Sequence, residues 1–177
     1  LRRAEAVGYI AAQAELGLAI RRDPLTFAAI IVAHLVSLVL MAGYGVYVQV
    51  GLQMVFIVLA VHGWWNWSRH RGTDGRVQVT RMTQVELIVY PVVTLLLAAP
   101  LSLIYLRGGF GGGIGSALLL TGGIAAQLAL NFRRIESWIT RIGVDVVGIF
   151  VFVSYGGWVA VLFHLIFVAL AVKGWRD

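Results

Sequence analysis

His34, Gln53, Asp145 and His164 are polar side chains that interrupt long apolar stretches of this sequence. Imidazole, amide and carboxylate groups supply hydrogen-bond donors and acceptors, and an imidazole can also take up a proton near neutral pH. The guanidinium of Arg141 lies one helical turn before Asp145. Because such groups are costly in hydrocarbon and rarely face lipid, we expect them to line a path or cavity for a polar solute.

The four residues are related by a constant offset of 111 positions, which pairs His34 with Asp145 and Gln53 with His164. The offset belongs to an internal repeat, in which residues 44–64 read YGVYVQVGLQMVFIVLAVHGW and residues 155–175 read YGGWVAVLFHLIFVALAVKGW. Apolar helices match easily in Leu and Val, but not in Tyr-Gly at one end and Gly-Trp at the other. We therefore expect the two pairs at equivalent places near mid-depth, facing one shared cavity.

Helical spacing adds an aromatic ring to this set. Trp138, Arg141 and Asp145 share one stripe of a helix, and a mixture of rings and hydrogen-bonding groups suits a flat heterocycle with polar substituents. Structural roles compete, since Arg141 could simply neutralise Asp145 or snorkel to the interface, and Gln53 and His164 could only bridge helices. The predicted solute-binding residues are His34, Gln53, Trp138, Arg141, Asp145 and His164.

The composition indicates that lipid surrounds these residues. The chain of 177 residues is 60% hydrophobic and 12% charged, with mean hydropathy +0.88, whereas soluble domains are about 45–50% apolar and about 25% charged. The net charge of +6 arises from cations between apolar stretches, which disfavours a nucleic-acid partner. The absence of cysteine excludes disulfides and thiol chemistry, and no cofactor or metal is expected.

The uncharged stretches predict an all-α membrane protein with seven transmembrane helices, at about residues 4–20, 24–42, 45–67, 85–106, 112–132, 136–154 and 157–175. Gly43-Tyr44-Gly45 marks a turn, and Gly108–Gly115 is predicted as a flexible loop. Residues 1–68 would form a first three-helix bundle, residues 69–110 a loop plus a linker helix, and residues 111–177 a second bundle. Since one helix separates the bundles, both would run in the same direction, as in the SWEET-like 3+1+3 parallel repeat.

Basic residues predict the orientation. With seven spans, and with Arg141 set aside as intramembrane, ten Lys and Arg residues lie on the side of the C-terminus and three on the side of the N-terminus. The positive-inside rule then places the C-terminus in the cytoplasm and the N-terminus outside. Trp64, Trp65 and Trp67 fit an interfacial aromatic belt better than a solute contact. No cleavable signal peptide is expected, because no A-x-A site closes a short apolar stretch after Leu1–Glu5.

Three motifs carry a family resemblance that extends over nearly the whole chain. They are Gln53-x9-Gly63-Trp64-x2-Trp67, Glu136-x-Trp138-x6-Asp145, and Gly156-x-Trp158 with the later Gly174-Trp175. In this order they resemble the bacterial Pnu vitamin transporters, the family of the nicotinamide riboside transporter PnuC. The resemblance implies a seven-helix SWEET-like protein of the bacterial inner membrane, often a homotrimer. It also implies facilitated diffusion of a vitamin that a cytoplasmic kinase then traps.

The sequence departs from the family pattern at positions that are expected to contact the substrate and determine its identity. Arg141 stands where a Trp is usual, Ala60 where an Asn is expected, and Asp145 and His34 where Asn is common. The Asp at position 145 resembles the residue that some riboflavin- and thiamine-type members carry there. The resemblance favours nicotinamide riboside, with riboflavin, thiamine and deoxynucleosides as alternatives, and proton coupling through His34 and Asp145 remains open.

Two other functional classes compete with transport. A membrane enzyme is disfavoured, because the chain has no H-E-x-x-H motif and its histidines lie in four separate segments. A non-transporting receptor would bind a solute without flux. The predicted partners are therefore a small-molecule vitamin and the lipid bilayer.

Overall fold

The described part of the chain is almost entirely helical. The computed structural model describes residues 2–45, 47–104 and 111–177. Within these ranges lie seven α-helices and one π-helical turn: α1 (Arg2–Ile20), α2 (Thr26–Gly43), α3 (Tyr47–Arg69), α4 (Gln84–Ile104), η2 (Gly111–Gly115), α5 (Ser116–Asn131), α6 (Ser137–Ser154) and α7 (Trp158–Arg176). The predicted number of helices is confirmed, and most predicted ends lie within a few residues of the observed ones.

Most of these helices have the length and apolarity that a bilayer requires. Six spans among the described residues qualify: Thr26–Gly43, Gln49–Arg69, Gln84–Leu103, Gly113–Asn131, Ser137–Ser154 and Trp158–Arg176. Only 6% of the α4 span is buried, so its leucines face outward, as lipid-facing side chains do. Helix α1 is not among the six, because it contains Arg2, Arg3, Glu5 and Glu15. Its crossing of the membrane therefore stays a prediction.

Contacts between residues divide the chain into two compact units. Unit 1 comprises Leu1–Val79 and Leu130–Arg133, and unit 2 comprises Thr80–Ala129 and Arg134–Asp177. Helix α4 thus groups with the helices that follow it. The predicted boundaries at residues 68 and 110 stay predictions.

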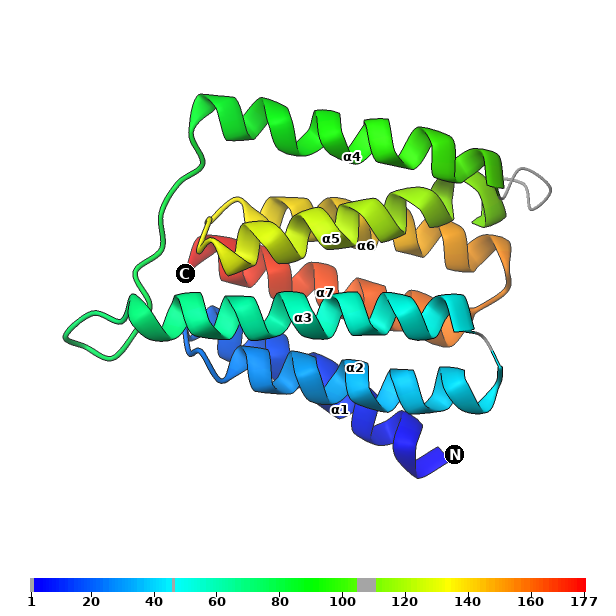
Figure 1. The fold of residues 1–177 in the computed structure, drawn as a ribbon, viewed down its shortest axis with the longest axis horizontal. Coiled ribbons are helices and arrows are strands. Elements are labelled where there is room, and N and C mark those ends of the chain that lie inside the picture. Colours follow the sequence, from blue (N-terminus) through cyan, green and yellow to red (C-terminus); the bar gives the residue numbers. More distant parts are fainter. Residues whose placement is uncertain (1, 46, 105–110) are drawn as a thin grey trace. The chain divides into compact units, whose positions relative to one another are not determined.

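In unit 1, α2 packs against both α1 and α3 (Figure 1). The edge of the Phe27 ring meets the Trp67 ring at a centroid distance of 5.1 Å. The Phe27 ring also occupies the space that a side chain at Gly63 would fill, so glycine allows α2 and α3 to approach closely. The buried cluster at this contact consists of Phe27, Ile30, Ala60, Trp67 and Val77.

The segment Leu130–Arg133, at the end of α5, is held within unit 1 by hydrogen bonds to α3. Asn131 is fully buried, and its Nδ2 donates to the carbonyl oxygen of Leu59 at 2.7 Å. The indole Nε1 of Trp67 donates to the carbonyl oxygen of Leu130 at 2.8 Å. These bonds satisfy the buried amide of Asn131 and the indole N–H of Trp67, which would otherwise be unpaired donors in an apolar contact.

A short hairpin follows α3. Arg71 and Val77 form an antiparallel bridge, and Gly75 turns the chain with a positive φ of 75°. The amide of Val77 donates to the carbonyl oxygen of Arg22 at 3.1 Å, and the Val77 side chain is buried. The hairpin is therefore tied to the turn between α1 and α2.

In unit 2, α6 packs against α7, and η2 packs against α4 and α6. A Cβ atom at Gly174 would lie 2.6 Å from Cε2 of Trp138, so the indole packs directly on the α7 backbone. Arg134 donates from Nη2 and Nε to Oε1 of Glu86, at 2.8 and 3.0 Å. This pair ties the first turn of α4 to the segment before α6.

The prediction of a loop at Gly108–Gly115 is wrong for Gly111–Gly115. Residues Gly111–Gly115 form the π-helical turn η2, with Gly113 at φ −93° and ψ −108°, while residues 108–110 lie outside the described ranges. Helical hydrogen bonds satisfy backbone polar groups in an apolar environment, which favours a turn over an open loop. Glycine tolerates the irregular dihedral angles at position 113.

Backbone geometry recurs at the 111-residue offset. Arg22 after α1 and Arg133 after α5 both have positive φ, at 58° and 62°, which is uncommon for residues other than glycine. At each, the next amide reaches back five residues to a helix carbonyl, from Asp23 to Leu18 and from Arg134 to Ala129, as in a Schellman motif. Gly45 and Gly156 likewise share φ values of 71° and 69°.

Candidate functional site

The first of the two polar pairs joins α2 to α3. Nδ1 of His34 lies 2.6 Å from Oε1 of Gln53. Since an amide oxygen only accepts hydrogen bonds, Nδ1 is the donor, and Nε2 of the neutral ring is left as an acceptor. The Phe56 ring stacks on the imidazole, with centroids 4.8 Å apart and planes 2° from parallel. The His34 ring is therefore held by a hydrogen bond at its edge and by an aromatic face.

The second pair joins α6 to α7 and carries charge. Nδ1 of His164 lies 2.8 Å from Oδ1 of Asp145, and Asp145 is only 3% exposed. Nε of Arg141 lies 3.8 Å from Oδ2 of the same carboxylate. A buried carboxylate requires such partners, because its desolvation would otherwise be very unfavourable.

One oxygen of this carboxylate is incompletely satisfied. Oδ2 of Asp145 accepts no hydrogen bond from any group in the described ranges, since 3.8 Å is beyond hydrogen-bond reach. Leaving a buried acceptor unpaired destabilises a fold by about 1–3 kcal/mol, and more for a charged group. Oδ2 therefore retains an unused capacity to accept a hydrogen bond within this buried pair.

The imidazole of His164 is packed tightly on three sides. A Cβ atom at Gly148 of α6 would lie 2.6 Å from its Cε1 atom, so the ring lies directly on the α6 backbone. Phe152 stacks against it at a centroid distance of 5.4 Å, and Phe167 meets it edge-on at 6.3 Å. These contacts fix the ring that donates to Asp145.

Five of the six predicted site residues form these two clusters, each cluster inside one unit. His34 meets Gln53 in unit 1, and Asp145 meets Arg141 and His164 in unit 2. Trp138 lies elsewhere on α6, 8% exposed, with its ring against Gly174. A separation of seven residues from Asp145 corresponds to about 10 Å along a helix. The stacking of Trp138 on a solute stays a prediction.

Sequence reasoning missed Gly148 and Phe152, which position His164. The repeat carried no signal for them, because the residues at the same offset in unit 1 are Ser37 and Met41. A glycine beneath a histidine on another helix is a tertiary contact that no pattern within one helix indicates.

The two clusters offer groups that can form hydrogen bonds and charge interactions. Within the described ranges, no three side chains from His, Cys, Asp and Glu gather closely enough to hold a metal ion. The groups offered are imidazole nitrogens, an amide and a carboxylate oxygen, with aromatic faces beside them.

A family model described as nicotinamide mononucleotide transporter matches residues 3–177. The chain belongs to the nicotinamide mononucleotide transporter family. A search of functionally curated proteins gave no significant match. Because the family match spans nearly the whole chain, this family member is a membrane transport protein, and the predicted family is confirmed.

The fold of this family member is similar to a known transporter structure. That structure is titled "Crystal structure of the Vitamin B3 transporter PnuC", and the TM-score is 0.75. The alignment covers 98% of this chain and 79% of that one at 13% sequence identity. At this identity the likeness establishes the fold alone, that of a helical multi-pass membrane protein.

Proposed function

We propose that this transporter mediates facilitated uptake of nicotinamide riboside or a closely related vitamin. The observation that carries the proposal is the pair of helix-bridging hydrogen bonds, His34–Gln53 and His164–Asp145, which join residues at the same offset of 111. Polar groups at mid-helix are unfavourable in a membrane unless they serve a solute or each other. The His164–Asp145 pair satisfies itself only partly, because Oδ2 of Asp145 accepts no hydrogen bond from the described residues.

The buried carboxylate favours the nucleoside over its phosphorylated form. A ribose hydroxyl or a carboxamide N–H could donate to Oδ2 of Asp145, whereas a phosphate dianion has no donor and would be repelled. An N-ribosylpyridinium ring also carries a positive charge that complements the carboxylate. Arg141, 3.8 Å from Oδ2, neutralises part of the negative charge of Asp145. Hydrogen bonds to the solute would therefore contribute to binding together with the attraction between opposite charges.

Thiamine is the second candidate, for a specific reason. Its thiazolium ring is cationic and its aminopyrimidine carries donors, so the same carboxylate would serve it. Riboflavin is uncharged and gains less from Asp145. A ligand panel separates these substrates.

The architecture that we propose is the 3+1+3 parallel repeat in a bacterial inner membrane. Helices α2 and α6 begin and end at positions 111 residues apart, and so do the first residues of α3 and α7. The recurring positive φ values at Arg22 and Arg133 support the same relation. The positive-inside count favours a cytoplasmic C-terminus and an external N-terminus. The proposal that the protein assembles as a homotrimer is supported by the family resemblance alone.

The test is a thermal-shift panel on the purified protein in neutral detergent. A ligand that binds only the folded state raises the melting temperature with concentration. We expect a rise with nicotinamide riboside and none with nicotinamide mononucleotide. Asp145→Ala should abolish the shift while the variant remains folded, and Val146→Ala, next in sequence and 39% exposed, should retain it. A shift with the mononucleotide alone, or an unchanged shift in Asp145→Ala, would contradict the proposed site.

A further inference from the structure

An apolar groove on α3 ends at an arginine. The groove has a volume of about 450 Å³ and lies in unit 1, where its lining comes from Val61, Trp64, Trp65, Ser68 and Arg69. The two rings and the valine are 37–55% exposed. The groove therefore presents an open apolar surface over two turns of the helix and a cation at its end.

The arginine at the end of the groove is held in place by a ring. The guanidinium carbon of Arg69 lies 4.0 Å from the centroid of the Trp65 ring, within the range of a cation–π interaction. This stacking uses the face of the guanidinium and leaves its N–H groups directed along its edge. A planar fork of donors fixed in this way suits a phosphate group.

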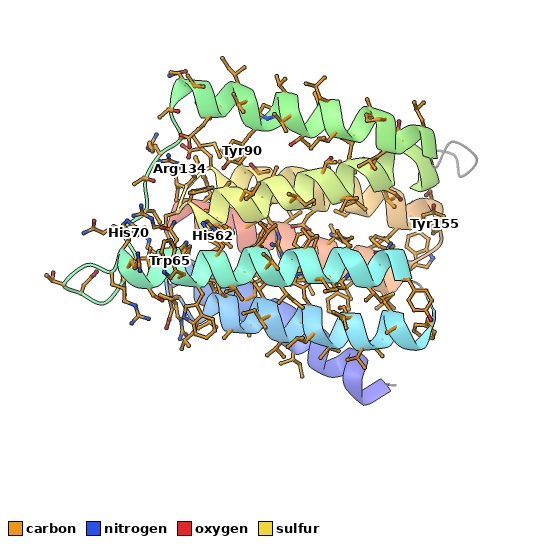
Figure 2. All side chains as sticks on the ribbon, in the orientation of Figure 1. His62, Trp65, His70, Tyr90, Arg134 and Tyr155 are labelled. Atoms are coloured by element: carbon orange, nitrogen blue, oxygen red, sulfur yellow. The ribbon has the colours of Figure 1, made fainter. Side chains whose placement is uncertain are left out.

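The same end of unit 1 is strongly basic. Arg21, Arg71 and Arg76 are exposed there, and the hydrogen bond from Val77 to Arg22 brings the hairpin beside the turn after α1. Figure 2 labels Trp65 and His70 at this end of α3. The acidic residues nearby, Asp23 and Asp74, cap local backbone amides through their Oδ1 atoms. The balance of charge is positive.

Depth in the membrane connects the groove to a ligand. The apolar span of α3 runs from Gln49 to Arg69, so Arg69 marks the point where the helix leaves the hydrocarbon. Tryptophan rings concentrate at this level, and basic residues there attract anionic headgroups. The groove thus descends from the headgroup region toward the acyl chains.

We propose that this groove is a binding site for an anionic phospholipid. The phosphate lies on the edge of the Arg69 guanidinium, and one acyl chain follows Trp65, Trp64 and Val61. The basic end of unit 1 adds long-range attraction. A free phosphate compound would engage the arginine and leave the apolar part of the groove uncovered, which is why a lipid fits both ends of the site.

The experiment is a lipid titration of the purified protein, read by native mass spectrometry. Phosphatidylglycerol and phosphatidylcholine with identical acyl chains are compared on the wild type, Arg69→Gln and the control Arg176→Gln, which removes an exposed arginine at the end of α7 in unit 2. We expect the wild type to bind one phosphatidylglycerol about fivefold more tightly than phosphatidylcholine, the size expected for one basic residue at a membrane surface. Arg69→Gln should remove most of this preference, and Arg176→Gln should change it less than twofold.

A second variant keeps the proposal testable if Arg69→Gln is poorly folded. Trp65→Leu retains apolar surface but removes the ring that holds the guanidinium, so it should reduce the preference about threefold. Equal binding of both lipids to the wild type, an unchanged preference in both groove variants, or full displacement by soluble glycerol phosphate would overturn the proposal. Retention of a second copy of the chain in place of lipid would overturn it as well.

Discussion

The imidazole of His164 lies 2.8 Å from the carboxylate of Asp145, in a partly buried contact between α6 and α7. In the equivalent contact of unit 1, the histidine and its hydrogen-bond acceptor lie on the opposite helices of the pair. There the histidine is on the earlier helix, at His34, and the acceptor is on the later helix, at Gln53. The chain thus has a helix-bridging hydrogen bond in each copy of the repeat, but only the second copy has a carboxylate in this bond.

This exchange predicts that the unit 2 pair can be transplanted into unit 1. We expect His34→Asp or Gln53→His alone to lower the free energy of unfolding, because each alters one side of the bond. The double variant His34→Asp/Gln53→His should recover part of the loss. Contacting residues typically show coupling of about 0.5–3 kcal/mol in such a cycle. Chemical denaturation in detergent measures all four proteins, and strictly additive effects would show that the two side chains do not interact.

A second prediction concerns the close approach of α2 and α3 at Gly63. Gly63→Ala places a methyl group where the Phe27 ring lies, and overpacking of this kind destabilises by about 1–3 kcal/mol. Gly51→Ala is the matched control in the same helix, because its added methyl would meet nothing within 4 Å. Thermal unfolding should separate the two variants by several degrees. Equal melting temperatures would mean that the two helices are farther apart than described.

Sequence reasoning succeeded where a residue's neighbours are set by its own helix or by the repeat. The prediction for residues 24–42 matches Thr26–Gly43 closely, because an uncharged apolar run has few ways to satisfy its backbone in lipid. The offset also identified the residues of both polar pairs, although not the hydrogen bond within each pair.

Local backbone conformations and one contact between distant segments are what the sequence did not reveal. Nothing in the type of Arg22 or Arg133 indicates a left-handed backbone, which is imposed by the Schellman ends of α1 and α5. The turn η2 was predicted as part of a loop, since five residues with four glycines carry no periodic pattern. The tie between the hairpin and Arg22 also joins segments far apart in sequence.

A third prediction uses the absence of cysteine to map the orientation. Tyr44→Cys and Thr73→Cys lie at opposite ends of α3 at exposed positions, so they should be on opposite sides of the membrane. In intact cells, a membrane-impermeant maleimide should label Tyr44→Cys and leave Thr73→Cys and Asp177→Cys unlabelled until the membrane is broken. The reverse pattern would invert the proposed orientation.

A fourth prediction separates two roles of Arg141. If it stabilises the Asp145 carboxylate, Arg141→Gln should lower both the melting temperature and solute affinity, because the buried charge loses its counter-ion at 3.8 Å. A loss of about 1–3 kcal/mol is expected. Arg176→Gln, exposed at the end of α7, removes the same charge and should have little effect. Equal effects of the two variants would indicate a snorkelling role for Arg141.

The most direct measurement is the flux of radiolabelled nicotinamide riboside into proteoliposomes. We expect uptake by the wild type to stop when internal and external concentrations are equal and to be independent of an imposed pH gradient, and Asp145→Ala to show almost none. Wild-type vesicles that bind the vitamin without accumulating it internally, or Asp145→Ala vesicles that match the wild-type rate, would contradict the account.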